Sequence, residues 1–221
     1  FQLIHASEES LRCQNNYLGV PVQHPAGVHE ILEDTLVLAV HPHQLAAAWT
    51  EKKVYLLHSL LPFVLKASPL GFDFTARLLT VGGFLPAGPA FGKRQSLRVQ
   101  PKDPVQALVA QEGIRMTATL ADLSTDGVGV YTFAALLHEQ VEFRKDDPIT
   151  VGFHLPTYPR QLAINGFITN ALKMRGNFIR RIGIRAAPQG EAASALAEYI
   201  ATRQAEIILQ LQGLSRELAK L

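Results

Sequence analysis

The amino-acid sequence predicts an all-β protein: two small β-barrel-like domains, the second a six-stranded antiparallel barrel, followed by a long C-terminal α-helix. Three observations lead to this prediction. Short runs rich in branched residues and separated by turn residues recur from Tyr17 to Ala186, as is typical of antiparallel barrels. Four glycines and two prolines in residues 82–92 interrupt these runs. Residues 190–221 instead repeat apolar side chains every three or four positions, which is a helical period.

Composition bounds the class of protein. With 221 residues, 48% hydrophobic and 18% charged, the chain is long enough for one large or two small globular domains. A net charge of +2 is too small to predict nucleic-acid binding. The single cysteine, Cys13, excludes an internal disulfide framework and fits a reducing compartment.

The sequence also predicts a cytoplasmic protein without a membrane span. Residues 54–65 form the most apolar run and include His58 and Pro62. This run has about twelve residues, whereas a spanning helix needs roughly 20. The first residues include Glu8 and Glu9 and lack the apolar core of a signal peptide.

Residues 1–81 are predicted to form an N-terminal accessory β-domain. Residues 1–16 are interpreted either as a short helix around residues 6–12 or as a loose arm. Residues 43–50 are rich in alanine and predict a helical turn. The predicted strands are residues 18–22, 27–32, 35–40, 53–58, 63–68 and 72–81.

Residues 82–93 are predicted to be a linker, because their glycines and prolines do not suit a helix or a central strand. Residues 94–189 then form the second domain. Its regularly spaced short strands favour a closed antiparallel barrel. The predicted strands are residues 105–110, 115–121, 127–133, 149–155, 161–168 and 178–186.

Residues 190–221 predict one helix with an apolar seam. The seam positions alternate in steps of three and four, as in a coiled-coil heptad; they are Ala193, Ala197, Ile200, Gln204, Ile207, Leu211, Leu214, Leu218 and Leu221. One interpretation is packing along the barrel. The other is a coiled coil with a second copy, favoured because such a helix is about 48 Å long at about 1.5 Å per residue, longer than a small barrel is wide. The sequence therefore predicts a homo-oligomer.

Two short motifs contain side chains that suit ligand binding. The first contains Lys93, Arg94 and Arg98, at the end of the glycine-rich segment; the second contains Asp122, Ser124 and Gly127. Arginine is a fork of N–H donors that suits phosphates and the O6/N7 edge of guanine. A carboxylate accepts hydrogen bonds and suits the N–H edge of guanine. Glycine lets a backbone come close to a ligand. This inventory fits a guanine nucleotide.

Arg94 and Arg98, followed by Asp122, Ser124 and Gly127, resemble the signature of the PilZ family, bacterial receptors for cyclic di-GMP. Each motif alone is common, and the conjunction in this order and separation is more specific. The resemblance extends over roughly residues 92–188. It includes residues 165–168 and 181–184, which are similar to the family's last barrel strands. The layout of an accessory β-domain before this region resembles the flagellar-brake subgroup.

The resemblance implies a role for each motif residue. Arg94 and Arg98 would grip phosphate and the Hoogsteen edge of guanine. Asp122 would accept from guanine N–H groups, Ser124 would contribute a hydroxyl contact, and Gly127 would permit the turn. Lys93 stands where many members have arginine, so the positive charge is kept but the paired N–H donors of a guanidinium group are lost. The resemblance also implies that no cofactor other than the ligand, cyclic di-GMP, is required.

The predicted function is a non-enzymatic receptor that changes its domain arrangement when cyclic di-GMP binds. It would regulate a protein partner in motility, secretion or exopolysaccharide production. The alternative is an assembly module that uses the C-terminal coiled coil and binds no nucleotide. No serine-hydrolase elbow and no phosphate-binding loop appear in the sequence, so no catalytic residue is predicted.

A metal site is not predicted either. The candidate metal ligands are His41 and His43, together with His24 and His29. A proline separates the pair, and no cysteine or carboxylate lies at ligand spacing from it.

Overall fold

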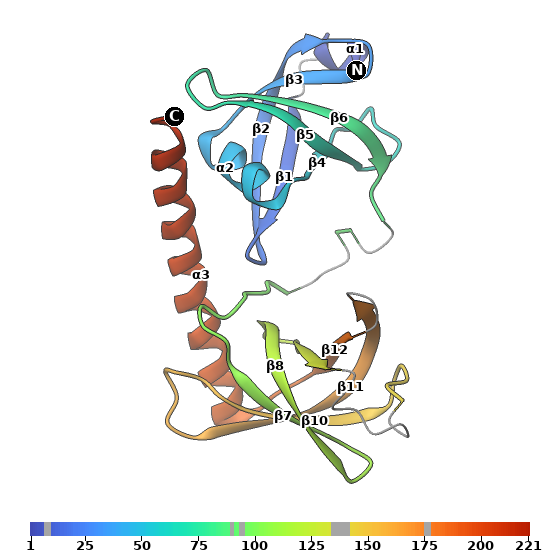
Figure 1. The fold of residues 1–221 in the computed structure, drawn as a ribbon, viewed down its shortest axis with the longest axis vertical. Coiled ribbons are helices and arrows are strands. Elements are labelled where there is room, and N and C mark those ends of the chain that lie inside the picture. Colours follow the sequence, from blue (N-terminus) through green and yellow to red (C-terminus); the bar gives the residue numbers. More distant parts are fainter. Residues whose placement is uncertain (7–9, 89–90, 93–95, 134–141, 175–177) are drawn as a thin grey trace. The chain divides into compact units, whose positions relative to one another are not determined.

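Each half of the chain closes a barrel from six strands that follow one another in sequence. The computed structural model describes residues 1–221 apart from 7–9, 89–90, 93–95, 134–141 and 175–177 (Figure 1). The chain divides into two compact units, Phe1–Gln95 with Glu206–Leu221, and Ser96–Ala205. Both barrels are closed and antiparallel and a helix ends the chain, so the predicted fold class is confirmed.

The first barrel has the strand order β1–β2–β3–β6–β5–β4, and β4 pairs back with β1. Its strands are β1 (Leu11–Tyr17), β2 (Val20–Ile31), β3 (Thr35–Val40), β4 (Val54–Leu57), β5 (Leu65–Asp73) and β6 (Leu78–Pro86). Helix α1 (Gln2–His5) precedes them, and α2 (Pro42–Glu51) connects β3 to β4. Helix α2 begins at Pro42, which suits the first helical position, after His41, whose Nδ1 accepts the His43 amide at 3.2 Å.

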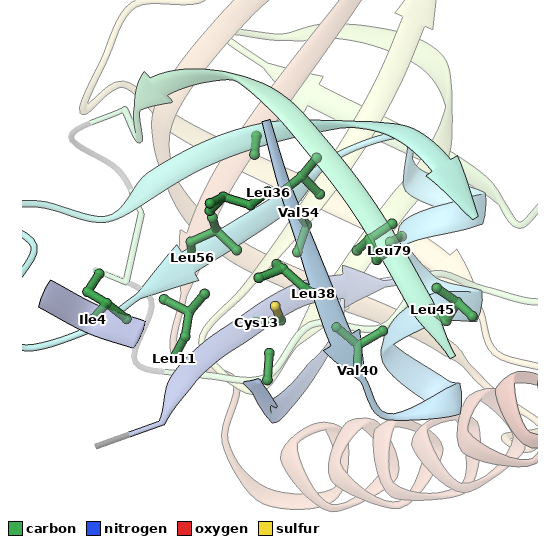
Figure 2. Close-up of a cluster of buried hydrophobic side chains, with 14 residues drawn as sticks. Ile4, Leu11, Cys13, Leu36, Leu38, Val40, Leu45, Val54, Leu56 and Leu79 are labelled. Atoms are coloured by element: carbon green, nitrogen blue, oxygen red, sulfur yellow. The ribbon is translucent and has the colours of Figure 1, made fainter. Parts of the chain in front are cut away.

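Branched aliphatic side chains fill this barrel (Figure 2). Leu38, Val54, Leu56 and Leu79 are fully buried, because alternate residues of a strand point to the same face. Cys13 lies among them and is also fully buried. Burial raises the pKa of the Cys13 thiol to about 12, so this residue behaves as a small apolar side chain.

The interpretation of residues 6–12 as a helix is wrong at its end, because residues 11 and 12 belong to strand β1 (Leu11–Tyr17), and helix α1 ends at His5. Residues 7–9 lie outside the described residues. The alternation of β1 was hidden by a polar residue on the inner face. Asn15 is fully buried and donates to the Glu51 carboxylate at 2.9 Å and to the Lys53 carbonyl at 2.7 Å. Hydrogen bonds of this kind let a buried amide occupy a core position.

Residues 72–81 are not one strand. Strand β5 ends at Asp73 and β6 begins at Leu78. The Asp73 carboxylate accepts the Ala76 amide at 2.7 Å, and Arg77 has a φ of 59°, so a tight turn divides the segment.

The segment predicted as a linker from residue 82 begins as strand, because β6 continues through Pro86. A Cβ on Gly82 would lie 2.7 Å from the Leu70 side chain. Gly83 has a φ of 61°, and the pairing of β5 with β6 shifts register nearby. These glycines therefore accommodate a close contact and an irregularity within a strand, which are ordinary uses of glycine in sheets.

The second barrel has the strand order β10–β11–β12–β9–β8–β7 and closes through β10 and β7. Its strands are β7 (Gln106–Gln111), β8 (Ile114–Ser124), β9 (Gly127–Phe133), β10 (Pro148–His154), β11 (Gln161–Met174) and β12 (Ile179–Ala186). Val109, Val130, Val151, Ile168 and Ile182 are fully buried in its interior. Their neighbours in sequence face outward, which makes the outer face available for a site.

Helix α3 (Gly190–Leu218) buries one stripe of side chains along its length. Leu196 and Ile200 are buried in the second unit, and Ile207, Leu211 and Leu218 in the first. Much of the predicted coiled-coil seam is therefore covered within the chain.

Candidate ligand-binding site

Asp122 reaches the outside of the second barrel because of a β-bulge. Leu120 pairs with Val130 and Asp122 pairs with Gly129, so β8 has one residue more than β9 at this point. In a regular strand Leu120 and Asp122 would face the same way. The extra residue lets Leu120 point into the core while Asp122 points outward, and re-aiming a side chain is a common use of a bulge.

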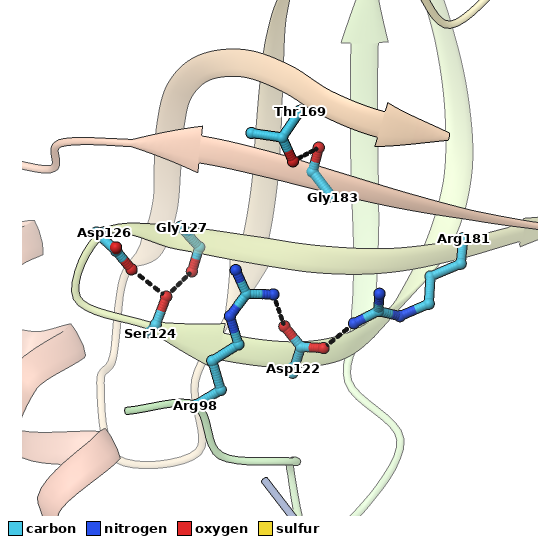
Figure 3. Close-up of polar contacts among 8 residues, drawn as sticks. All are labelled: Arg98, Asp122, Ser124, Asp126, Gly127, Thr169, Arg181 and Gly183. Atoms are coloured by element: carbon cyan, nitrogen blue, oxygen red, sulfur yellow. Dashed lines mark hydrogen bonds and ion pairs between the residues drawn. The ribbon is translucent and has the colours of Figure 1, made fainter. Parts of the chain in front are cut away.

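Two arginines hold the Asp122 carboxylate between them (Figure 3). Arg98 Nη1 donates to Asp122 Oδ1 at 3.3 Å, and Arg181 Nη2 donates to Asp122 Oδ2. The Asp122 side chain is 12% exposed, that of Arg181 20% and that of Arg98 29%. The cluster is thus shielded and still reachable from solvent.

Arg181 was not among the residues predicted for the site. It lies on β12 and faces outward, whereas its neighbour Ile182 is buried. The signal was present in the sequence, because Arg181, Gly183 and Arg185 alternate with Ile182 and Ile184. Only the strand order β8–β9–β12 brings that outward face to Asp122.

Ser124 is the last residue of β8, and its hydroxyl is bonded within the turn that follows. Its Oγ is 2.6 Å from Asp126 Oδ1 and 3.1 Å from the Gly127 carbonyl oxygen, and the residue is 1% exposed. The sequence predicted a hydroxyl contact with ligand. In the structure the hydroxyl instead bonds within the turn near Asp122 and helps to close it.

Asp126 is a second carboxylate in this turn that the sequence prediction left out. Partial burial by itself would raise its pKa. Hydrogen bonds from Ser124 and Ser96, together with the positive charge of Arg98, outweigh this and lower the pKa of Asp126 below its ordinary value. Asp126 is therefore ionised at neutral pH.

Gly127 is required by the packing of strands and not by an unusual backbone angle. A Cβ at Gly127 would lie 2.3 Å from the Ile184 carbonyl oxygen, far inside van der Waals contact. Gly127 therefore lets β9 approach β12, on which Arg181 lies. The sequence predicted that Gly127 permits the turn. In the structure, Gly127 permits the close approach of β9 and β12.

Lys93 and Arg94 lie outside the described residues. Of the six residues predicted for the site, Arg98, Asp122, Ser124 and Gly127 are described, and all four lie in the second compact unit.

The charges of the described cluster balance, with Arg98 and Arg181 against Asp122 and Asp126. A carboxylate offers about four lone-pair positions, and the two arginines use two of those on Asp122. The carboxylate can therefore accept further N–H donors without losing its arginines. Arg98 and Arg181 each keep donors for an anion or for acceptor atoms of a base.

Three histidines of the first barrel come together, although the sequence predicted no metal site. The possible ligand atoms of His24, His41 and His43 lie within 4.8 Å of one another. The His24 and His41 rings are stacked at a centroid distance of 3.9 Å. His41 Nδ1 already accepts the His43 amide, so the proton of the neutral ring is on Nε2.

The surroundings of the three histidines disfavour protonation of His24 and His41. Burial lowers the pKa of both His24 and His41, and the charges of neighbouring histidines lower it further. The pKa of His41 is also lowered by the positive charge of Arg77. The rings lie at the positive end of α2.

No protein-family model matches the chain, and no curated protein matches it. Solved structures do. The structure of Bacillus subtilis inhibitor of motility (MotI/DgrA) is 12% identical, with a TM-score of 0.43, over 90% of this chain and 97% of that chain. The K. pneumonia MrkH–c-di-GMP complex is 11% identical, with a TM-score of 0.43, over 92% and 89%.

The PilZ domain with c-di-GMP of YcgR from Escherichia coli is 13% identical, with a TM-score of 0.40, over 54% of this chain and 98% of that chain. This last structure is a PilZ domain, the family whose signature the two motifs resemble. These values describe a distant similarity, so the function rests on the residues of the site.

Among the described residues, no helix combines the length and apolar character needed to cross a membrane.

Proposed function

We propose that this chain is a non-enzymatic receptor for cyclic di-GMP and that the ligand binds on the outer face of the second barrel. One observation supports this most strongly. Arg98 and Asp122 belong to different motifs, 24 residues apart in the chain, and are hydrogen-bonded to each other. Arg181 completes an arginine–carboxylate–arginine array, which is complementary to a guanine and an adjoining phosphate.

Each residue of the array has a proposed role. Asp122 accepts the N–H groups of one guanine, and Arg98 and Arg181 donate to phosphate or to guanine O6 and N7. Ser124 and Gly127 hold the turn and the close strand pair that position Asp122. Arg94 and Lys93 add positive charge for a ligand that carries two phosphates.

Ligand binding is proposed to change the arrangement of the two domains. The cations predicted from the sequence lie on both sides of the boundary between the compact units, with Arg94 before it and Arg98 after it. A ligand held by both arginines and by Asp122 would favour one domain arrangement, provided that it binds that arrangement more tightly. The altered surface would then be read by a protein partner in motility, secretion or exopolysaccharide production.

The alternative function, assembly through a coiled coil of α3, has less support. Ile200, Ile207, Leu211 and Leu218 of the seam are buried within the chain. A coiled coil needs these side chains on a free face. Self-association through α3 stays a prediction, and the burial of the seam argues against it.

The proposed function is tested by calorimetric titration of cyclic di-GMP into the parent chain, Arg98→Ala and Arg160→Ala. The parent should bind at micromolar concentration or tighter, about −8 kcal/mol. Removing a shielded arginine from a charged ligand costs roughly 2–5 kcal/mol, so Arg98→Ala should show no heat. Arg160 makes an exposed pair with Glu191, and its removal should leave binding unchanged.

Absence of binding by the parent, checked by the ligand-induced shift of amide resonances in NMR spectra, would overturn the proposal. Equal binding by the parent and Arg98→Ala would show that the ligand does not bind at this face of the barrel.

A further inference from the structure

Four adjacent strands of the second barrel place two polar residues at the ends of one row, with two glycines between them. Asp122 on β8 pairs with Gly129 on β9, and Gly129 pairs with Gly183 on β12. Gly183 pairs with Asn170 on β11. Paired residues share a face of the sheet, so Asn170 faces the same outer surface as Asp122.

A second bulge turns Asn170 outward, as the bulge in β8 does for Asp122. The pairing of β11 with β12 shifts between Ile168 and Asn170, and Thr169 is the additional residue. Thr169 Oγ1 donates to the Gly183 carbonyl at 3.0 Å (Figure 3), which fixes this bulge. Ile168 is fully buried, whereas Asn170 is exposed. Bulges on both sides of one row are frequent devices for aiming side chains at a site.

The two glycines form a floor without side chains. A Cβ on Gly129 would lie 2.9 Å from Asp122 Oδ1, and a Cβ on Gly183 would lie 2.9 Å from Asn170 Oδ1. Neither glycine has a positive φ, so backbone conformation does not require them. Their missing side chains let the carboxylate lie over β9 and the carboxamide over β12. Neighbouring strands such as these are spaced by about 4.8 Å.

Asn170 offers hydrogen-bonding groups that the described part of the chain does not use. Within that part its carboxamide makes no hydrogen bond to another side chain or to the backbone. A carboxamide has two N–H donors and one carbonyl acceptor. The Asp122 carboxylate at the other end of the row only accepts hydrogen bonds, so Asn170 adds donors to this face.

We propose that Asn170 reads guanine together with Asp122. The Asp122 carboxylate accepts the N–H groups of the Watson–Crick edge, and the Asn170 amide donates to the adjoining O6 while the base lies over Gly129 and Gly183. Adenine carries an amino donor in place of O6 and no N–H at the ring position facing Asp122, so the pair selects guanine. This inference rests on the proposed function and adds a residue outside both sequence motifs.

The test compares cyclic di-GMP binding by the parent, Asn170→Ala and Gly183→Ala. Loss of one hydrogen bond to the base should weaken binding by Asn170→Ala about tenfold. Gly183→Ala should fold, because the three atoms nearest to its new methyl group belong to the side chains of Thr169 and Asn170 and not to the backbone. It should weaken binding at least as much, because it fills the floor and displaces Asn170.

Asn165→Ala is the matched control. Asn165 lies on the same strand and is exposed, and it is bonded to Thr150; this variant should bind like the parent. Equal thermal unfolding of all variants excludes misfolding. In NMR spectra of the parent, the Asn170 side-chain amide, assigned by its disappearance in Asn170→Ala, should shift when cyclic di-GMP is added.

The outcomes separate this inference from the proposed function. Parent-like binding by both Asn170→Ala and Gly183→Ala, with an unshifted amide, overturns the inference and leaves the receptor standing. No binding by the parent overturns both.

Discussion

Asp122 shows how a single residue depends on its neighbours for a functional position. Its carboxylate is largely shielded from water and lies between Arg98 and Arg181. A charge in such a place requires partners, because an unpaired shielded charge is costly. The same partners leave lone pairs free, so the residue can be both stable and ready to bind.

The histidine cluster of the first barrel predicts a pH-dependent stability. Burial and neighbouring positive charges lower the pKa of His24 and His41 below the ordinary value. The folded state then binds fewer protons than the unfolded state below about pH 6.5. The free energy of unfolding should therefore be highest above this pH and fall as pH decreases through the lowered pKa values.

Urea unfolding between pH 7.5 and 5.0, followed by the fluorescence of Trp49, measures this effect, because Trp49 is the single tryptophan and lies in the first unit. His24→Gln should reduce the decrease in stability. His29→Gln, on the same strand and exposed, should retain it. An identical pH dependence for the parent and His24→Gln would contradict the prediction.

At the scale of elements, helix α3 is stabilised by its packing and less by its intrinsic helix propensity, as is usual for helices in proteins. Leu211 is 5% exposed and belongs to the first unit, whereas Leu209 is 66% exposed. The two leucines differ by two positions, which on a helix places them on different faces.

Leu211→Ala should lower the free energy of unfolding of the first unit by about 2–5 kcal/mol, as for other buried leucines. Leu209→Ala should change it by less than about 0.5 kcal/mol. Chemical denaturation followed by Trp49 fluorescence compares the two. Equal losses in both variants would show that the end of α3 does not pack as described.

At the scale of the whole molecule, the buried residues of α3 lead to an expectation about the oligomeric state, and the proposed ligand site leads to one about the domain arrangement. We expect a monomer with a mass near 24.2 kDa, because four apolar residues of the seam are already buried within the chain. We also expect cyclic di-GMP to alter the arrangement of the two compact units.

Small-angle scattering coupled to size exclusion, with and without cyclic di-GMP, measures both quantities on one sample. The forward scattering should correspond to one chain, and the scattering profile should change when ligand is present. A mass of two chains would restore the coiled-coil interpretation. Superimposable profiles at saturating ligand would contradict the change in domain arrangement.

Much of the fold follows from the sequence because its determinants are local. Branched residues at alternate positions, separated by turn residues, predicted the strands of the second barrel, and the period of the last residues predicted α3. Where a local pattern was misleading, tertiary partners explain it. Asn15 is buried through its bonds to Glu51 and Lys53, and Gly82 lies within a strand against Leu70.

Arg98, Asp122, Ser124 and Gly127 were predicted as site residues from the sequence alone, because they stand in two recognisable motifs. Only the tertiary structure decided which other residues join them. Arg181 lies 59 residues further along the chain and is bonded to Asp122 through the strand order of the barrel. Two bulges place Asn170 and Asp122 on the same outer face, in one row across four strands. Pairing across a barrel depends on register between distant segments, which no local pattern in the sequence records.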